Sequence, residues 1–496
     1  MSFSKIPQFV IPVLLVAIVL ISGCSTNPAT GEQSFTAFMD AEDEIRVGAE
    51  EHPKMLEAFG GTYDDRALTA YLNAIGQRMV AKSELPDLKF QFFVLNDDTV
   101  NAFALPGGYV YISRGLIALA EDEAELAGVI GHEIGHVTAR HSAQRYSSAM
   151  ATNIGLTAVS IIGSVLGAPS GLGNLASFGA QAALQSYSRG QELEADKLGV
   201  RYMTQLGYDP SALGDFFSKL DAHTNIHAKK AGRSADTFNI MQTHPRTSDR
   251  INQAKELAKT ETPPDARRVR LPFLSQIDGL LFGKDPKEGF MKGDTFIHPE
   301  LGFKFDFPPN FKVDNGKTKI EATDDKGTTI VFDMESPKVA TGMPDLSSYI
   351  SRHWGPKLDI KPENVDTLTI NGLPAATARA SVDTNKGPHE FRMLVIRGAR
   401  DRLYRFVFLT TPEVTDKMSV PLRRTTYSFN LLKPGEENQF QPPRIRIKTV
   451  NAGESETSIA AKMPFDDYND DWFRALNLNV ISDGLAIGEK VKVVGN

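Results

Sequence analysis

The segment His132-Glu133-Ile134-Gly135-His136 constrains the fold of this chain more than any other feature, because its polar side chains act together only on one helix. Histidines four residues apart project from the same helix face, one turn apart, where both imidazoles can bind one tetrahedral metal ion. Glu133 then lies beside the position of a metal-bound water and can act as its general base. Residues 121–127, rich in good helix formers, favour this helix. The pattern predicts the site of a zinc-dependent peptidase.

The third metal ligand has to come from elsewhere in the chain. Metzincin spacing would place a histidine at position 142 and a glycine at position 139, where this chain has Ser142 and Ala139. His141 is one residue out of register, and we interpret it as a polar residue near the helix end. The metzincin arrangement is therefore excluded.

A second acidic cluster supplies the missing ligand. Glu192 and Asp196 are four residues apart in a segment of helical composition and share one helix face. We expect Glu192 to coordinate the metal, as in gluzincins, and Asp196 to accept the Nδ1 proton of a ligand histidine. Glu194 points to a different face. The alternative is that these acids form an ordinary solvated surface. Gly131 and Gly135 leave room for another element to approach the first helix closely.

Together these blocks resemble the zinc metallopeptidase family that includes the CAAX prenyl protease, HtpX and the periplasmic BepA-type proteases. Two further blocks carry the resemblance, Asn101-Ala102-Phe103-Ala104-Leu105-Pro106-Gly107-Gly108 and residues 243–251, which begin Thr-His-Pro-Arg. The resemblance covers about residues 40–258. It implies one zinc ion per chain, endopeptidase activity, and a role in processing or clearing membrane-associated or misfolded proteins.

The two further blocks contain candidates for contact with the substrate. His244 and Arg246 are candidate catalytic donors to the oxyanion. Alternatively, His244 occupies the open metal position and holds the enzyme inactive, or both residues are structural. We expect the substrate-binding residues Asn101, Ala102, Phe103 and Ala104 to lie on an edge strand that pairs with an extended polypeptide. An internal strand of the fold is the alternative.

The N-terminus predicts export and a lipid anchor. Residues 1–23 carry one charged side chain, Lys5, and an apolar run too short for a comfortable membrane span. Ile21-Ser22-Gly23-Cys24 resembles a bacterial lipobox, in which Cys24 is lipidated and becomes the mature N-terminus. An ordinary signal peptide is the alternative. Ser25 after the cysteine favours the outer membrane, by resemblance to sorted lipoproteins, with the protein on its periplasmic face.

Composition narrows the remaining choices. The formal net charge of −7 offers no broad basic surface, so nucleic acid is not an expected partner. Cys24 is the only cysteine, so its lipidation leaves none for a disulfide. Residues 150–184 are apolar and small, and we favour two packed helices beside the active site over a membrane hairpin.

The predicted fold class is α+β. The apolar pattern changes to alternation from about residue 295, as in the strand candidates Phe303–Phe307 and Leu403–Phe408, and Asn371-Gly372 predicts a turn. The C-terminal residues resemble a LysM module, a βααβ unit that would bind peptidoglycan. The expected segments are a signal peptide (1–23), a lipidated tether (24–39), a mainly helical gluzincin metallopeptidase domain (40–258), a linker (259–294), an antiparallel α+β accessory domain for partner binding or scaffolding (295–435) and the LysM-like module (445–496).

Two classes of function follow from the sequence. The first is a lipid-anchored periplasmic zinc metalloendopeptidase that hydrolyses misfolded or membrane-associated envelope proteins. The second is a chaperone or assembly factor that binds unfolded outer-membrane proteins beside their assembly machinery, with proteolysis minor or latent. The intact set of His132, His136 and Glu192 with Glu133 favours the first, because a pure binder has no need of a general base.

Overall fold

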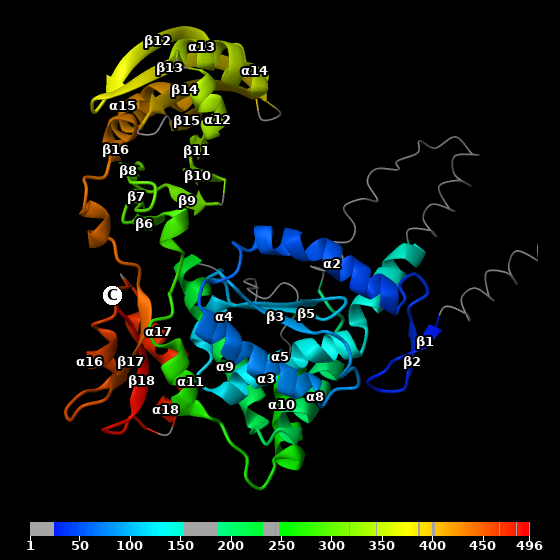
Figure 1. The fold of residues 1–496 in the computed structure, drawn as a ribbon. Coiled ribbons are helices and arrows are strands. Elements are labelled where there is room, and N and C mark those ends of the chain that lie inside the picture. Colours follow the sequence, from blue (N-terminus) through cyan, green and yellow to red (C-terminus); the bar gives the residue numbers. More distant parts are fainter. Residues whose placement is uncertain are drawn as a thin grey trace, which may run out of the picture. The chain divides into compact units, whose positions relative to one another are not determined.

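The computed structural model describes residues 24–152, 186–231, 244 and 248–495, apart from short breaks at 317, 344, 385–386, 399–401, 466 and 483. The chain forms two compact units (Figure 1). The first unit comprises residues 1–283 and 443–496, and the second unit comprises residues 284–442. The predicted signal peptide, most of the apolar stretch 150–184, and Arg246 lie outside the described residues.

The first unit combines helices with small sheets. Its elements are, in chain order, β1 (Cys24–Thr26), β2 (Gln33–Phe35), α2 (Ala41–Ala58), α3 (Arg66–Val80), β3 (Gln91–Leu95), β4 (Ala102–Leu105), β5 (Tyr109–Ser113), α4 (Arg114–Leu119), α5 (Glu123–Thr138), α8 (Arg189–Gln205), α9 (Ser211–Ala231), α10 (Ser248–Glu261), α11 (Arg270–Ile277), β17 (Arg444–Thr449), α16 (Glu456–Ala460), α17 (Asn469–Leu476), α18 (Leu478–Ser482) and β18 (Lys490–Gly495). Residues 141–152 are also helical.

The sheet next to the predicted site has the strand order β3-β5-β4. Strand β3 is parallel to the middle strand β5, and β4 is antiparallel to it. One face of the sheet packs against α2, with Met55 and Phe103 in a shared cluster, and the other face contributes Phe92 and Ile112 to the main core with α3 and α5. Figure 1 shows α2 on one side of β3 and β5 and the helices α3 and α5 on the other.

Helices α5 and α8 pack backbone to backbone because glycines lie where they meet. A Cβ added at Gly199 would lie 2.8 Å from the backbone nitrogen of His132, and one added at Gly131 would lie 3.0 Å from the Cα of Gly199. A Cβ at Gly135 would lie 3.1 Å from the carbonyl oxygen of Ala195. The space predicted beside Gly131 and Gly135 is therefore filled by the helix that carries Glu192.

Residues 24–39, predicted as a loose tether, are docked on the first unit. Strands β1 and β2 pair antiparallel. The Asn27 side-chain amide donates to Glu194 on α8 at 2.8 Å, and the Phe38 backbone nitrogen donates to the Ser147 hydroxyl at 3.1 Å. These hydrogen bonds hold the segment in place, and polar contacts of this kind leave no pattern in the sequence.

The C-terminal residues also belong to the first unit and do not stand apart as the predicted module. Strands β17 and β18 form an antiparallel pair around three short helices, α16 to α18, where the sequence predicts two. Ile445, Trp472 and Val491 are buried in the same core as α5 and α9. The apolar side chains that we read as a small separate core therefore complete a larger one.

A buried lysine ties this C-terminal segment to the start of α5. The Lys492 ammonium donates to the carbonyl oxygens of Ala118, Leu119 and Ala120 at 2.8, 3.0 and 2.5 Å. Three acceptors match the three N–H donors of an ammonium group, so the charge is solvated by main chain. One residue on, the Glu121 carboxylate accepts the backbone N–H of Asn479 at 3.0 Å.

The predicted linker 259–294 is folded. Helix α11 buries Phe273 and Ile277 in the main core. Ahead of it, the Arg268 guanidinium pairs with Asp122 and with Asp215, both at 2.7 Å. The two prolines at 263 and 264 therefore mark a turn within the first unit, and the boundary between the units falls at residue 283.

The second unit is an antiparallel α+β domain, as predicted, with wider limits than 295–435. Among the described residues it has a seven-stranded sheet of order β12-β13-β14-β15-β11-β10-β9 and a four-stranded sheet of order β16-β8-β7-β6. Asn371 and Gly372 both have positive φ, 48° and 85°, and form the predicted tight turn between β12 and β13. Phenylalanines such as Phe303 and Phe406 fill its core.

The elements of the second unit are η3 (Pro286–Glu288), β6 (Phe290–Lys292), β7 (Thr295–His298), β8 (Phe303–Asp306), β9 (Lys312–Asn315), β10 (Lys319–Thr323), β11 (Thr329–Met334), α12 (Pro337–Gly342), α13 (Leu346–Tyr349), η4 (Ile350–Trp354), α14 (Gly355–Lys357), β12 (Glu363–Ile370), β13 (Leu373–Thr384), β14 (Gly387–Arg397), β15 (Leu403–Thr410), α15 (Pro412–Ser428), β16 (Asn430–Leu431) and η6 (Glu436–Gln439). None of the helices in the described parts of either unit combines the length and apolar character needed to cross a membrane.

The close packing of α5 and α8 predicts a specific sensitivity to an added methyl group. We expect Gly199→Ala to lower the melting temperature and the zinc affinity, because the methyl must push α5 away and such overpacking costs about 1–3 kcal/mol. Gly190→Ala on the same helix is the matched control, since its new Cβ would meet nothing closer than the Ser188 hydroxyl at 4.0 Å. Thermal unfolding and zinc titration measure both effects. Equal melting temperatures for the two variants would contradict the packing argument.

Candidate metal centre

Helix α5 presents His132, Glu133 and His136 to the interior. The Asp122 carboxylate caps the helix by accepting the Glu125 backbone N–H, which anchors the first turn. The three side chains are at most 4% exposed. The Nε2 atoms of the two histidines are 3.0 Å apart, so both rings point at one position.

Helix α8 brings the predicted carboxylates to the same position. It starts with a capping box in which Ser188 and Gln191 each bond to the other's backbone N–H. The Glu192 carboxylate lies 3.6 Å from His132 Nε2 and 3.5 Å from His136 Nε2. The two imidazoles and this carboxylate therefore meet, although 56 residues separate His136 from Glu192 in the sequence.

The geometry of these donors fits zinc. Donor atoms of a tetrahedral zinc site lie about 3.4 Å from one another, given zinc–nitrogen bonds of about 2.1 Å. The separations among His132, His136 and Glu192 run from 3.0 to 3.6 Å. Imidazole nitrogen and carboxylate oxygen are donor types that zinc accepts.

His244 supplies a fourth donor at the same point. Its Nδ1 lies 3.2 Å from His132 Nε2 and 3.0 Å from the Glu192 carboxylate, and the donor atoms of all four residues lie within 4.8 Å of one another. Burial acts to lower the pKa of His244, but the carboxylates of Glu133 and Glu192 outweigh burial and raise it. The structure thus places His244 where the fourth ligand of a tetrahedral ion would be.

Asp196 lies behind His132, as the sequence predicts. Its carboxylate lies 2.8 Å from His132 Nδ1, so it can accept the ring N–H and leave Nε2 free for a metal. The Arg250 guanidinium pairs with the same carboxylate at 2.7 and 2.8 Å and with Glu192 at 2.5 Å. Burial acts to raise the pKa of Asp196, but Arg250 and then His132 hold it below the usual value.

His141 lies just past the end of α5, as interpreted from the sequence, but it also contacts the metal centre. It is fully buried, its Nδ1 lies 2.8 Å from His136 Nδ1, and its Nε2 lies 3.4 Å from the Glu194 carboxylate. A chain of polar groups, His136, His141 and Glu194, therefore supports the second histidine of the motif. His141 thus supports His136 in the way that Asp196 supports His132.

Glu133 is enclosed beside the four donors. Burial raises the pKa of its carboxyl group, and His244 and His132 act in the opposite direction. Its carboxylate lies 3.5 Å from His244 Nε2. A raised pKa makes a carboxylate a stronger base, which suits Glu133 to accept a proton during a reaction.

The predicted substrate-binding residues lie on the edge strand β4, with Asn101 just before it. Asn101 pairs with Ser113 on β5 through a main-chain bond of 3.0 Å, so by alternation the main chains of Ala102 and Ala104 face away from β5. Within the described part of the chain, nothing hydrogen-bonds to those groups of Ala102 or Ala104. Strand β4 thus has a row of main-chain donors and acceptors without a strand partner among the described segments, on residues that are only 1–2% exposed.

Besides the role of His141, sequence reasoning missed two residues of this centre, Arg250 and Tyr187. Arg250 lies inside the block 243–251, and its position near an acidic cluster in a chain with a metal motif was a usable signal. Tyr187 stacks on the His136 ring with centroids 3.7 Å apart, and the Arg145 guanidinium lies 3.6 Å from the Tyr187 ring centre. Nothing in the sequence indicates that contact.

Comparison with known proteins also indicates a zinc metallopeptidase. The model of peptidase family M48 matches residues 66–258. The Beta-barrel assembly-enhancing protease of Yersinia pestis is 31% identical over 233 residues, which is 46% of this chain and 46% of that protein. Mitochondrial metalloendopeptidase OMA1 of Schizosaccharomyces pombe is 33% identical over 202 residues, 39% of this chain and 56% of that protein.

A shorter relative is covered almost completely. Metalloprotease LoiP of Escherichia coli is 26% identical over 250 residues, 48% of this chain and 91% of that protein. In contrast, the chain spans about half the length of the assembly-enhancing proteases it matches. The similarity therefore concerns the metallopeptidase domain, and the rest of each protein lies outside it.

The contacts of Arg250 predict its importance for the zinc site. We expect Arg250→Leu to lower the free energy of unfolding by about 3 kcal/mol in the metal-free protein, because it leaves two buried carboxylates without their cation. Zinc affinity should fall about 10- to 100-fold. Arg189→Leu is the matched control, since Arg189 joins the same two helices through an exposed pair with Asp249. Denaturant unfolding and zinc titration test this, and a control variant as damaged as Arg250→Leu would refute it.

Proposed function

We propose that the protein is a zinc endopeptidase that cleaves misfolded or membrane-associated proteins of the bacterial envelope, because residues 66–258 match the model of peptidase family M48. The observation that carries the proposal is the convergence of His132, His136 and Glu192 on one point, with Glu133 buried beside them. A purely structural zinc site would have no use for an acid such as Glu133 next to its ligands.

The residues divide the reaction between them. Zinc held by His132, His136 and Glu192 would supply a Lewis acid that polarises the scissile carbonyl. Glu133 takes the proton of the attacking water and passes it to the leaving amine. Asp196 keeps His132 in the tautomer that presents Nε2. Arg246, which lies outside the described residues, remains the candidate donor to the oxyanion.

The main chain of β4 suits an extended substrate. A polypeptide that pairs with Ala102 and Ala104 would add a strand to the sheet order β3-β5-β4. Such pairing recognises the main chain of the substrate and tolerates many side chains. This breadth fits a protease that clears unfolded proteins. Some relatives are named for the assembly of β-barrel proteins. We therefore propose that the substrates are unassembled outer-membrane β-barrel proteins, which the protease cleaves near their assembly machinery.

Location and accessory binding complete the proposal. We propose that Cys24, exposed in the described part of the chain, is lipidated and holds the protein on the periplasmic face of the outer membrane. Mass measurement of the N-terminal peptide from membranes tests this. We further propose that the β17–β18 segment is LysM-like and contacts peptidoglycan, which a pull-down with purified sacculi tests.

The alternative, an assembly factor with latent proteolysis, is less well supported. A protein that only binds unfolded chains needs the β4 edge but not a buried general base. Glu133 is 1% exposed and its burial is costly for a charged group, so its presence indicates a chemical use.

Glu133→Gln tests the endopeptidase proposal. We expect the cleavage rate of an unfolded porin to fall by at least about 100-fold, because the general base is lost, while zinc content stays at one ion per chain. Removal of zinc with a chelator should also abolish cleavage. Gel analysis of digestion with parallel metal analysis gives both readouts, and equal digestion by wild type and variant would exclude the assignment.

His244→Ala tests whether His244 holds the site closed. We expect the variant to keep zinc, because three ligands remain, and to cleave the unfolded porin faster, because the position of its Nδ1 becomes free. If His244 instead donates to the oxyanion, the rate should fall by about 100-fold or more. Initial rates at saturating and limiting substrate separate the two outcomes.

A further inference from the structure

The edge of the sheet opposite β4 has an incomplete strand pairing. Strand β3 bonds to β5 through its odd-numbered residues, as the bond from the Gln91 nitrogen to the Gly108 carbonyl shows. Alternation therefore turns the N–H and C=O groups of Phe92 and Val94 away from β5. These groups form the outer edge of the sheet.

A segment of the chain already occupies half of this edge. The Tyr63 nitrogen donates to the Val94 carbonyl at 2.8 Å, the Asn96 nitrogen donates to the Gly61 carbonyl at 3.0 Å, and Thr62 lies opposite Leu95 in antiparallel orientation. After Tyr63 the chain turns away into α3, whose N-terminus Asp65 caps. The antiparallel pairing therefore stops in the middle of β3.

The other half of the edge is only partly satisfied. Side-chain amides from α3 cover two carbonyls: Gln77 donates to Phe90 at 2.9 Å, and Asn73 donates to Phe92 at a long 3.4 Å. In the described parts of the chain, the N–H groups of Phe92 and Val94 have no hydrogen-bond acceptor. Unpaired main-chain groups on an edge are a template for another strand.

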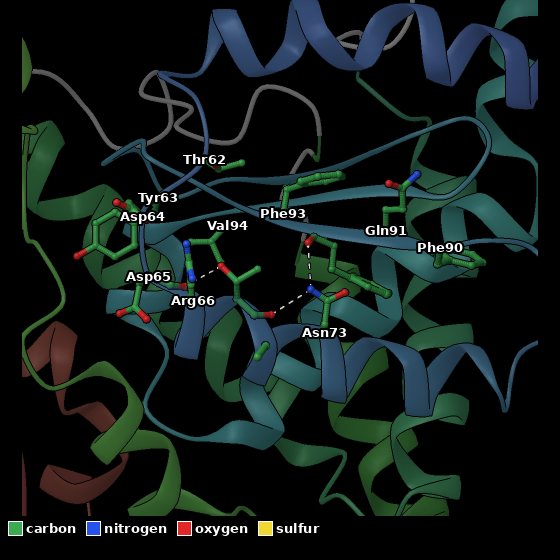
Figure 2. A pocket seen from close by; sticks show the side chains of 13 residues that line it. Thr62, Tyr63, Asp64, Asp65, Arg66, Asn73, Phe90, Gln91, Phe93 and Val94 are labelled. Carbon is green, nitrogen blue, oxygen red and sulfur yellow. Dashed lines mark hydrogen bonds between the residues drawn. The ribbon is translucent and has the colours of Figure 1, made fainter.

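A groove runs along this half of the edge. Its volume is about 590 Å³, within the range of ligand pockets. Figure 2 shows Phe90, Gln91, Phe93 and Val94 along the strand, with Asp65, Arg66 and Asn73 below them and Tyr63 at one end. Ala70, exposed on α3, also lines it, so a small side chain stands where a larger one would fill the space.

We propose that this groove, the β3 groove, binds an extended polypeptide segment as an added strand antiparallel to β3. The segment would continue the row of pairing that Gly61–Tyr63 begins. One of its carbonyls would accept the free N–H group of Phe92, because Tyr63 already lies opposite Val94. We infer the antiparallel orientation from Thr62, which already pairs antiparallel with Leu95 on the same edge. The occupant is an unfolded protein, so the inference rests on the proposed class of substrate.

The β3 groove is distinct from the cleavage site. Strands β3 and β4 are the two opposite edges of one sheet, about 10 Å apart across the middle strand. One unfolded chain could pair with both edges through two segments. Binding at β3 would then raise the effective concentration of the second segment at β4, which favours long unfolded substrates over short peptides.

The binding experiment uses the full-length, zinc-loaded Glu133→Gln protein, which cannot consume the probe. The probe is a fluorescein-labelled octapeptide of alternating valine and threonine, blocked at both ends. Amide hydrogen exchange reports the position of binding, and fluorescence anisotropy reports the affinity. We expect amide exchange at Phe92 to slow by at least tenfold with saturating probe. Slowing confined to Ala102 and Ala104 on β4 would overturn the proposal.

Two further arms separate strand pairing from apolar adsorption. Ala70→Trp fills the groove and should weaken the β3-dependent affinity at least tenfold, whereas Ala67→Trp, on an exposed face of α3 outside the groove, should not. A probe with the same side chains on an all-ester main chain, whose carbonyls are weaker hydrogen-bond acceptors than amide carbonyls, should also bind about tenfold more weakly. Equal affinities for both variants, or for both probes, would overturn the proposal without any loss of folding.

Failure of the proposed activity would be seen separately. Digestion of full-length unfolded porin by the wild-type protein tests the enzyme, and its rate for the octapeptide alone tests the β4 site. With the β3 groove in use, Ala70→Trp should slow digestion of the porin and leave octapeptide cleavage unchanged. An enzyme inactive on both substrates would sink the endopeptidase proposal, and an equal effect on both would sink the β3 groove.

Discussion

The direct contact between α5 and α8 is the constraint on which the metal centre depends. Gly199 faces the main chain of His132, and no side chain keeps the two helices apart there. Only at this distance can a short carboxylate such as Asp196 reach an imidazole on the neighbouring helix. The ligands come from separate helices, so the packing of the helices fixes their geometry more strongly than any loop could.

Close packing also buries charge, and the structure balances it locally. Glu192 and Asp196 are almost completely enclosed, and one guanidinium, Arg250, pairs with both. The planar guanidinium of Arg250 fixes the orientation of both carboxylates, because it donates in set directions. The same principle recurs at the start of α5, where Lys219 pairs with Glu121 and Glu125 in the interior.

The sequence predicts the parts of the site that have local spacing. His132 and His136 share a face at four residues, as do Glu192 and Asp196, so helical period alone identifies both pairs. Arg250 and His141 were missed because their roles depend on contacts between elements, which no local period reports.

The fold was predicted in the same uneven way. Alternation identified the second unit and its turn at Asn371-Gly372. The limits of the first unit were wrong because buried residues such as Lys492 look, in sequence, like surface residues.

The return of residues 443–496 to the first unit has a consequence for the order of folding. Lys492 contacts Ala118 across 374 positions of sequence, with the whole second unit between them. Contacts with such separation form late, because loop closure costs entropy before the contact repays it. During synthesis the second unit is complete before Lys492 exists, so the helix with the ligand histidines gains this anchor only after the second unit has been made. The metal centre thus matures later than its early place in the sequence would indicate.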